Sequence, residues 1–228
     1  MVLMVYPLTS PATHRTLRQR WSRQLLALLG IELQPAGHHI EPGCMLVANH
    51  VSWLDIFVVN ALAPSAFVSK AEVRTWPLIG WLAAKNETVF LRRGSRGHAK
   101  IINAEIGTLL DTGRNVAIFP EGTTTDGTHL LHFHGALLQP AVETGRPVQP
   151  VAISYHAADG RRSLAAAYVG ETTLLQSLQA ILAAPALEAR VAALPALPVA
   201  GSTRRELAPA ARAAIAAGLG IELPETGH

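Results

Sequence analysis

The stretch MLVANHVSWLDIFVVNAL, residues 45–62, decides the fold because a strand pattern is followed at once by a helix pattern. Residues 45–48 are apolar throughout, as in a short buried strand, and residues 53–62 have the pattern of a helix. The connecting loop contains His50, and Asp55 falls in the first turn of the helix. Alternating strands and helices predict an α/β domain whose sites form at the carboxyl ends of the strands.

The same alternation continues along the chain. Buried strands are predicted at residues 66–69, 89–91, 116–119 and 148–154, and helices at residues 97–110, 133–143, 174–182 and 203–219. The turn-rich residues 34–43 and the proline-punctuated stretch that ends at Pro198 are expected to be irregular. We therefore predict one α/β domain with a largely parallel mixed sheet flanked by helices.

The composition is rich in apolar residues and poor in charge. Of the 228 residues 49% are hydrophobic and 15% are charged, whereas about a quarter charged is typical of soluble proteins. The net charge of +3 suits anionic partners such as phospholipid head groups. The single cysteine, Cys44, excludes an internal disulfide framework and favours a reducing, cytosol-facing location. No apolar run approaches the length of about 18 residues that indicates a membrane-spanning helix.

Residues 13–31 have the pattern of a basic amphipathic helix that ends at Gly30. Arginines alternate with Trp21 and several leucines at spacings of three and four. Such a helix either packs on the domain with a solvated basic face, or lies in a membrane interface with Trp21 at the head-group level. We divide the chain accordingly into a membrane-surface helix region, residues 1–42, and an α/β domain, residues 43–228.

Two interpretations fit His50 and Asp55. In the first, Ser52 caps the helix and Asp55, three residues later, completes a capping box that leaves His50 without a role. In the second, the first helical turn brings the Asp55 carboxylate back to His50, which fixes the tautomer and leaves the other ring nitrogen as a base. The attacking oxygen then belongs to a substrate, so that no serine or cysteine nucleophile is required.

Residues 116–128, VAIFPEGTTTDGT, predict a strand that enters a sharp turn. There Gly122 can leave backbone N–H groups pointing at an anion, and Glu121 can bind a hydroxyl or orient the histidine. Alternatively, the stretch is an ordinary loop in which residues 123–126 cap the next element.

Cationic side chains near two other predicted strands can hold a phosphate. These are Lys70, Arg92 and Arg93, which flank an apolar segment at residues 76–81. The alternative is a solvated basic face beside a core segment. The strand at 148–154 carries Pro150 and is unremarkable by itself.

The four segments, taken in order, resemble the four-block pattern of the glycerolipid acyltransferases, the lysophospholipid or 1-acylglycerol-3-phosphate acyltransferase family. The blocks are Asn-His-x4-Asp, Lys-x6-Pro-x2-Gly leading to Phe-x2-Arg, Phe-Pro-Glu-Gly-Thr, and Val-x-Pro-Val, and they span residues 45–155. The resemblance implies a His-Asp catalytic pair and an arginine that binds the glycerophosphate of the acceptor. On it we expect His50, Asp55, Glu121 and Gly122 to be catalytic, and Lys70, Arg92, Arg93, Thr123, Thr124 and Pro150 to bind substrate.

One departure from the pattern concerns the acceptor. Many members that form phosphatidic acid have an arginine where this chain has Thr124, so one fixed cation is missing here. The departure therefore favours other lyso-lipids, including lyso-ornithine lipid and lysophosphatidylcholine, over lysophosphatidic acid.

The resemblance implies an enzyme that moves an acyl group from an acyl-CoA or acyl-carrier-protein thioester to a lyso-lipid hydroxyl. We expect it on the cytoplasmic face of the cell membrane, as a peripheral or monotopic protein without metal, prosthetic group or nucleic-acid partner. The alternatives are a lyso-lipid-binding protein without catalysis, and a thioesterase or lipase, although the chain lacks Gly-x-Ser-x-Gly. The histidines of THLLHFHGALL, residues 128–138, are interpreted as imidazoles near a helix start rather than as a zinc site.

Overall fold

A mostly parallel sheet forms the centre of the computed structural model, which describes residues 11–70, 89–91 and 96–224. Its seven strands, among the described residues, follow the order β1-β7-β6-β2-β5-β3-β4. Five strands run in one direction, namely β2 (Met45–Ala48), β3 (Ser65–Lys70), β4 (Val89–Leu91), β5 (Asn115–Ile118) and β6 (Val148–His156). The outer pair β1 (Ile31–Gly37) and β7 (Leu187–Ala193) runs the other way, so that β7 meets β6 antiparallel. The predicted fold class is confirmed.

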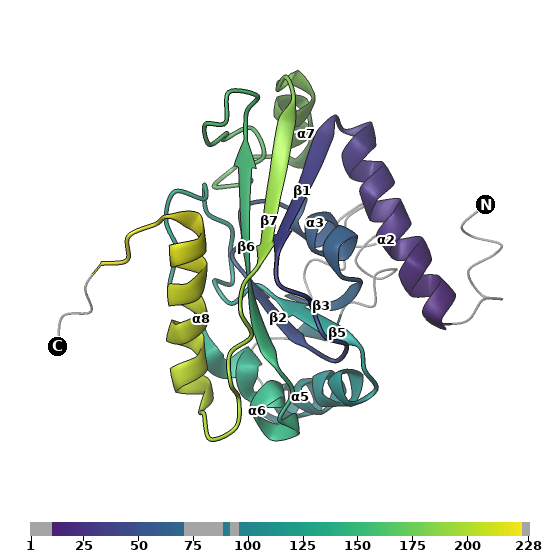
Figure 1. Ribbon diagram of the computed structural model, residues 1–228, viewed down its shortest axis with the longest axis vertical. Helices are drawn as coiled ribbons and strands as arrows, with labels where there is room; N and C mark the ends of the chain where they lie inside the picture. The colour runs from purple at the N-terminus through teal and green to yellow at the C-terminus, as the bar shows by residue number, and fades with distance from the viewer. Residues whose placement is uncertain (1–10, 71–88, 92–95, 225–228) are drawn as a thin grey trace.

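Helices cover both faces of the sheet (Figure 1). An apolar core lies between the sheet and the helices on each face. One core contains residues of α2 (Pro11–Leu28), α3 (Asp55–Leu62) and α7 (Leu174–Ala183). The other contains residues of α5 (Arg96–Asp111), α6 (Gln139–Thr144) and α8 (Arg204–Leu219). The central strand β2 supplies both cores, because Leu46 packs into the first while Met45 and Val47 pack into the second. Its carboxyl end, which leads to His50, is thereby fixed between two layers.

The strands β1 and β7 were not expected from the sequence pattern. Buried residues alternate with more exposed ones along β7, but three of its four buried residues have small or medium side chains. Only Leu187 is a large apolar residue among the surrounding alanines and prolines. β1 is exposed along most of its length and pairs with β7 alone. An edge strand tolerates Pro35, which would be disruptive in a central strand.

The helix expected at residues 133–143 is divided. A 3-10 helix, η3 (Gly135–Leu138), precedes α6, whose first turn contains Pro140. Proline lacks the N–H that a continuous helix would need at this position and fits best in a first turn, which agrees with a new helix starting there.

The N-terminal helix α2 packs on the domain. The Trp21 ring contacts Phe57 edge-on at a centroid distance of 5.5 Å, and Leu26 is buried. Arg18, also buried, donates from Nη1 to the carbonyl of Ser65 at 3.1 Å. Trp21 therefore lies against the core, and at least one arginine of the basic face is turned inward.

Polar side chains of α2 also satisfy the end of α3. Gln19 Nε2 donates to the carbonyls of Ala61 and Leu62, both at 3.2 Å, and Arg23 Nε donates to Ala61 at 3.1 Å. The last carbonyls of a helix have no partner within it, so these contacts tie α2 to the helix that carries Asp55. β1 also joins the sheet, so the described residues 11–42 pack with the rest of the chain, and the division at residue 42 stays a prediction. None of the described helices is long and apolar enough to span a bilayer.

Candidate active site

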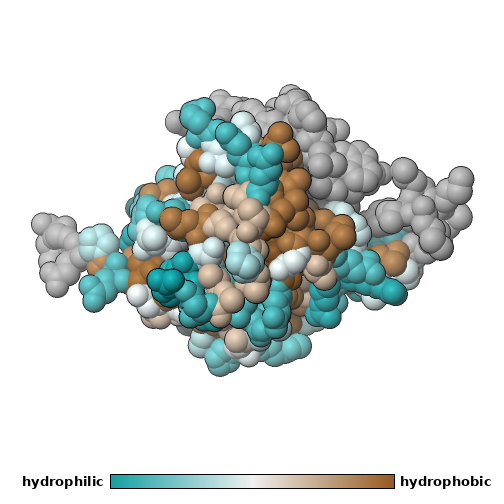
Figure 2. Space-filling model, turned by 90° about the horizontal axis from the view of Figure 1, so that it is seen from above, coloured by the Kyte–Doolittle hydropathy of each residue, from teal (hydrophilic) through white to brown (hydrophobic). Residues whose placement is uncertain are grey.

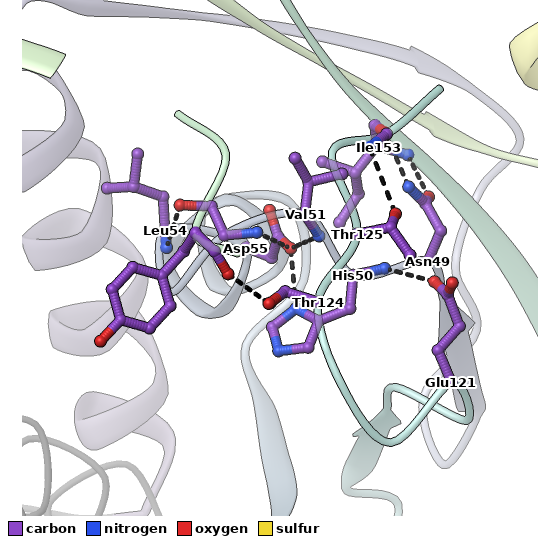
Figure 3. A network of polar contacts seen from close by, with 12 residues as sticks. Asn49, His50, Val51, Leu54, Asp55, Glu121, Thr124, Thr125 and Ile153 are labelled. Carbon is purple, nitrogen blue, oxygen red and sulfur yellow. Dashed lines mark hydrogen bonds and ion pairs between the residues drawn. The ribbon is translucent and has the colours of Figure 1, made fainter. Parts of the chain in front are cut away.

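His50 and Asp55 meet at the carboxyl end of β2. The strand ends at Ala48, α3 begins at Asp55, and the loop between them folds so that His50 Nδ1 lies 2.8 Å from Asp55 Oδ2. The Asp55 side chain is inaccessible to solvent, whereas the His50 side chain is 20% exposed. Figure 3 shows this contact. The fold-back that the spacing predicts is present.

The Asp55 carboxylate accepts four hydrogen bonds. Oδ2 receives the N–H groups of Val51 and Ser52, at 2.7 and 2.9 Å, in addition to His50. Oδ1 receives the hydroxyl of Tyr155 at 2.7 Å. An ionised carboxylate only accepts hydrogen bonds, so four converging donors match this form. The bond to the Ser52 N–H resembles one half of a capping box, but Leu54 is the N-cap of α3 and no side chain caps it, so the expected cap by Ser52 is not formed.

The His50 ring is held in place from two further sides. It stacks on Phe119 with ring centroids 4.1 Å apart and planes 13° from parallel. The main-chain carbonyl of His50 accepts a hydrogen bond from the N–H of Thr125 at 2.8 Å. No described residue contacts Nε2 by a hydrogen bond, and this nitrogen is therefore the one available to take a proton from a substrate.

Asn49 joins the loop to the neighbouring strand. Its side-chain amide donates to the carbonyl of Ile153 at 2.9 Å and accepts the Ile153 N–H at 2.8 Å. The pairing of β2 with β6 ends at Ala48 and Val151, so Asn49 continues it with a side chain where the strand itself has ended. Asn49 and Ile153 are both buried, which makes these bonds difficult for water to replace.

Glu121 holds the main chain of His50. Oε1 accepts the His50 N–H at 2.8 Å, and Oε2 accepts the Leu131 N–H at 2.9 Å. The side chain is 4% exposed, and this burial raises the pKa of Glu121, against the opposing effect of the two N–H donors. Of the two roles expected for Glu121, binding a hydroxyl or orienting the histidine, the contacts favour the second.

Gly122 enables the turn after β5, but its own N–H is occupied. It has φ of +71°, a conformation that favours glycine, and donates to the carbonyl of Phe119 at 3.1 Å. The N–H groups of Thr123 and Thr124, by contrast, donate to no residue in the described ranges. The Thr124 hydroxyl donates to the carbonyl of Tyr168. Any anion at this loop would thus meet the N–H groups after Gly122, and not that of Gly122 itself.

Of the remaining expected substrate-binding residues, the structure describes only the side chain of Pro150. Pro150 is buried in β6 opposite Val47, so its described role is packing. Lys70 ends β3, and its side chain lies outside the described residues, as do Arg92, Arg93 and the apolar segment 76–81. Their substrate contacts stay predictions.

The histidines of residues 128–138 form no metal cluster in the part of the chain that the structure describes. The rings of His132 and His134 contact each other edge-on at 5.4 Å. His129 instead lies 3.4 Å from the Asp126 carboxylate at an exposed position.

Two contacts of the site were missed in the sequence, those of Phe119 and Tyr155. Phe119 directly precedes Pro-Glu-Gly and follows a strand that pairs with β2. Tyr155 belongs to the strand on the other side of β2 and lies two residues beyond Ile153. Strand order would have been needed to find both, because neighbours in the sheet are far apart in sequence.

The geometry of His50 and Asp55 fits a general base, and no serine or cysteine of the described residues is hydrogen-bonded to the His50 ring. Such an arrangement fits enzymes that transfer a group to a hydroxyl of the substrate itself, as acyltransferases do. The chain belongs to the Acyltransferase family, whose family model matches residues 28–154.

Relatives of known activity agree with this assignment. The chain is 46% identical over 203 residues to a lyso-ornithine lipid O-acyltransferase of Pseudomonas aeruginosa, covering 87% of this chain and 78% of that protein. It is 36% identical over 204 residues to the Rhodobacter capsulatus protein of the same name, covering 87% and 74%. It is 41% identical over 158 residues to a 1-acyl-sn-glycerol-3-phosphate acyltransferase of Neisseria meningitidis, covering 67% and 62%.

A solved structure has the same fold. The crystal structure of the 1-acyl-sn-glycerophosphate (LPA) acyltransferase from Thermotoga maritima matches with a TM-score of 0.70 and 21% identity, covering 96% of this chain and 86% of that one.

Proposed function

We propose that this protein is an O-acyltransferase that esterifies a lyso-lipid with an acyl group from an acyl-CoA or acyl-carrier-protein thioester. The observation that carries the proposal is the His50 ring, bonded through Nδ1 to buried Asp55 and open to a substrate at Nε2. Family membership and the names of the relatives support the reaction type.

The proposed reaction needs one base and no covalent enzyme intermediate. Nε2 of His50 takes the proton of the acceptor hydroxyl while its oxygen attacks the thioester carbonyl, and a C–O bond forms. The C–S bond then breaks, and the thiolate recovers the proton from His50. The negative Asp55 carboxylate stabilises the imidazolium between these steps. We assign stabilisation of the carbonyl oxygen to the unpaired N–H groups of Thr123 and Thr124.

Lyso-ornithine lipid is the acceptor that we propose first. Two relatives that share 87% coverage of this chain carry that name. Thr124 supports the choice, since it stands where many phosphatidic-acid-forming relatives have arginine. Its hydroxyl donates a hydrogen bond to the Tyr168 carbonyl. The loop thus supplies no cation at this position for a phosphomonoester.

We also propose that the protein contacts the bilayer through α7. From Thr172 to Ala186 the chain carries no charged residue, and Leu175 and Leu182, two turns apart, are 65% and 60% exposed. Leu164, 61% exposed, lines a shallow cavity of about 580 Å³ together with residues of α7. Figure 2 looks onto the end of the molecule where α7 lies and shows hydrophobic residues gathered there. Surfaces of this kind fit lipid better than water.

α7 is also connected to the catalytic loop. Trp53, between His50 and Asp55 in the chain, donates from Nε1 to the Ser177 hydroxyl on the inner side of α7 at 3.0 Å. A bilayer held against α7 would therefore lie close to the loop that carries the base. Flotation with anionic vesicles tests this: Leu175→Glu with Leu182→Glu should reduce binding, while Ile101→Glu, equally exposed on α5 beyond the other sheet face, should not. Equal loss in both variants would refute the assignment to α7.

Transfer itself is tested with the purified protein in detergent. Labelled long-chain acyl-CoA, and then acyl-acyl-carrier-protein, is offered with lyso-ornithine lipid, lysophosphatidic acid and lysophosphatidylcholine in parallel. We expect a labelled diacyl product from lyso-ornithine lipid that His50→Ala does not form. Free fatty acid as the sole product would indicate a thioesterase, and binding without product would indicate a lipid-binding protein. Either result would overturn the proposal.

A further inference from the structure

The carboxylate of Asp55 is held by two unrelated parts of the chain. Its Oδ2 is bound by His50 and by two N–H groups of the same loop, all within five residues. Its Oδ1 is bound by the hydroxyl of Tyr155, one hundred residues further along the chain, at 2.7 Å. Tyr155 is 3% exposed and cannot reach a substrate, so whatever it does must act through Asp55.

The position of Tyr155 is fixed by the sheet. β6 runs beside β2, and the Asn49 amide binds both polar groups of the Ile153 main chain. Tyr155 lies two residues beyond Ile153, on the same side of the strand. The loop that presents His50 therefore also sets the register of the strand that presents Tyr155.

The Tyr155 hydroxyl remains a hydrogen-bond donor over the pH range in which the enzyme works. Burial raises the pKa of Tyr155 well above its ordinary value, and the nearby Asp55 charge raises it further. The titratable groups that face Asp55 among the described residues are His50 from its own loop, Glu121 from the loop after β5, and Tyr155 from β6. Among them only Tyr155 offers an uncharged hydroxyl.

We propose that Tyr155 is a positioning residue of the active site, whose hydroxyl holds the Asp55 carboxylate so that Oδ2 stays directed at His50 Nδ1. The inference rests on the proposed function, since it concerns the same base. A carboxylate bound at one oxygen alone can rotate about its Cβ–Cγ bond, whereas a carboxylate bound at both cannot.

Removal of the hydroxyl has two consequences. The carboxylate keeps the donors to Oδ2 but loses the donor to Oδ1, so the His50 ring is less often aligned for proton transfer, and kcat falls. The negative charge, no longer shared with Tyr155, concentrates toward His50 and favours the protonated ring, so the acid limb of the pH–rate profile moves to higher pH. Hydrogen bonds to charged groups are strong enough for a fall in kcat of about tenfold to a hundredfold.

The test compares Tyr155→Phe with Thr144→Val. The Thr144 hydroxyl donates to the Pro140 carbonyl at the same distance, 2.7 Å, but on α6 away from the site. Acyl transfer is followed against pH at saturating and limiting acceptor. In parallel, the Nδ1 proton of His50 is observed by NMR, with His50→Ala for assignment. This second readout needs no turnover and separates a failure of the inference from a failure of the proposed function.

The expected result for Tyr155→Phe is a lower kcat, an unchanged KM, an acid limb at higher pH and a displaced His50 Nδ1 proton resonance. Thr144→Val should match the wild type in all four. A wild-type acid limb and resonance in folded Tyr155→Phe would overturn the inference, even if kcat fell, since a merely structural role would leave both unmoved. If Tyr155→Phe does not fold, fluorinated tyrosine at position 155 replaces it, and an acid limb indifferent to the acidity of the phenol would overturn the inference equally.

Discussion

Replacing Asn49 by alanine should destabilise the protein strongly although no large apolar group is lost. The Asn49 amide is the partner of both the N–H and the carbonyl of Ile153. Asn49 and Ile153 are 1% and 0% exposed, and β2 has already ended, so neither water nor strand can take over the two bonds. Asn49→Ala thus leaves two buried backbone groups unpaired.

The magnitude follows from these two groups. An unpaired buried donor or acceptor costs about 1–3 kcal/mol, so we expect a loss of roughly 2–6 kcal/mol in the free energy of unfolding for the two groups. For a domain of this size that corresponds to a fall in Tm of roughly 4–24 °C. Urea unfolding followed by circular dichroism measures it, with Asn103→Ala on α5 as control, for which we expect a change within about 0.5 kcal/mol. A loss in Asn49→Ala no larger than in the control would refute the reasoning.

Asn49→Asp separates hydrogen bonding from the size of the side chain. The ionised carboxyl can still accept the Ile153 N–H, but it opposes the Ile153 carbonyl in a buried place. The protonated carboxyl can do both, as the amide does, so the fold raises the pKa of the introduced group above its unfolded value of about 3.9. Its contribution to stability is therefore complete below this value and lost as pH rises through the folded pKa. Asn49→Asp should gain stability relative to Asn49→Ala on acidification; a constant difference would contradict the pairing.

Other changes have separate expectations. His50→Ala should abolish transfer, while its free energy of unfolding stays within about 1 kcal/mol of wild type because the ring is partly exposed. Asp55→Asn should lower kcat by about 10³–10⁴-fold, as the loss of an orienting carboxylate does in other enzymes. Steady-state kinetics measures the transfer rate of both variants. Gln19→Ala should cost about 1 kcal/mol in urea unfolding, since it leaves the Leu62 carbonyl of α3 without this donor, while the Ala61 carbonyl keeps Arg23. Burial raises the pKa of the Cys44 thiol from 9.0 to about 12, so its stabilising contribution is complete below pH 9 and lost as pH rises toward 12. Cys44→Ala should therefore lose roughly 2 kcal/mol less than wild type between about pH 8.5 and pH 10.5, and parallel pH curves would contradict this.

Local contacts of the site could be predicted, and distant ones could not. His50 and Asp55 are five residues apart, and their contact depends on that spacing and on a helix that starts close to Asp55, both of which the sequence indicates. The contacts of Asn49 and Tyr155 with partners on or from β6 depend on which strand lies next to β2, and they span about a hundred residues. The pattern of apolar residues indicates that strands exist but not their order in the sheet.

The limits of the strand and helix predictions have a similar cause. β2 and β4 have the predicted bounds because both strands are short apolar runs. β1 and β7 were not predicted because small or exposed residues form them, and their pairing with neighbouring strands, β7 with β1 and β6, is not visible in the sequence pattern. The basic pattern of α2 correctly indicates a helix, but whether its arginines face solvent depends on α3 and β3, since Arg23 binds the Ala61 carbonyl and Arg18 that of Ser65.

The location of these groups also indicates where acceptor specificity cannot reside. Asp55, Glu121 and Tyr155 are buried and bind only His50, its loop or the Leu131 main chain, so they would serve any hydroxyl brought to Nε2. Gly122 and Thr123 are exposed on the loop beside them. A family that keeps one base with buried partners and changes its lyso-lipid must therefore change such exposed loops and the cations that flank them. The replacement of arginine by Thr124 is a change of that kind, which is why we give it more weight for the acceptor than the intact His50–Asp55 pair.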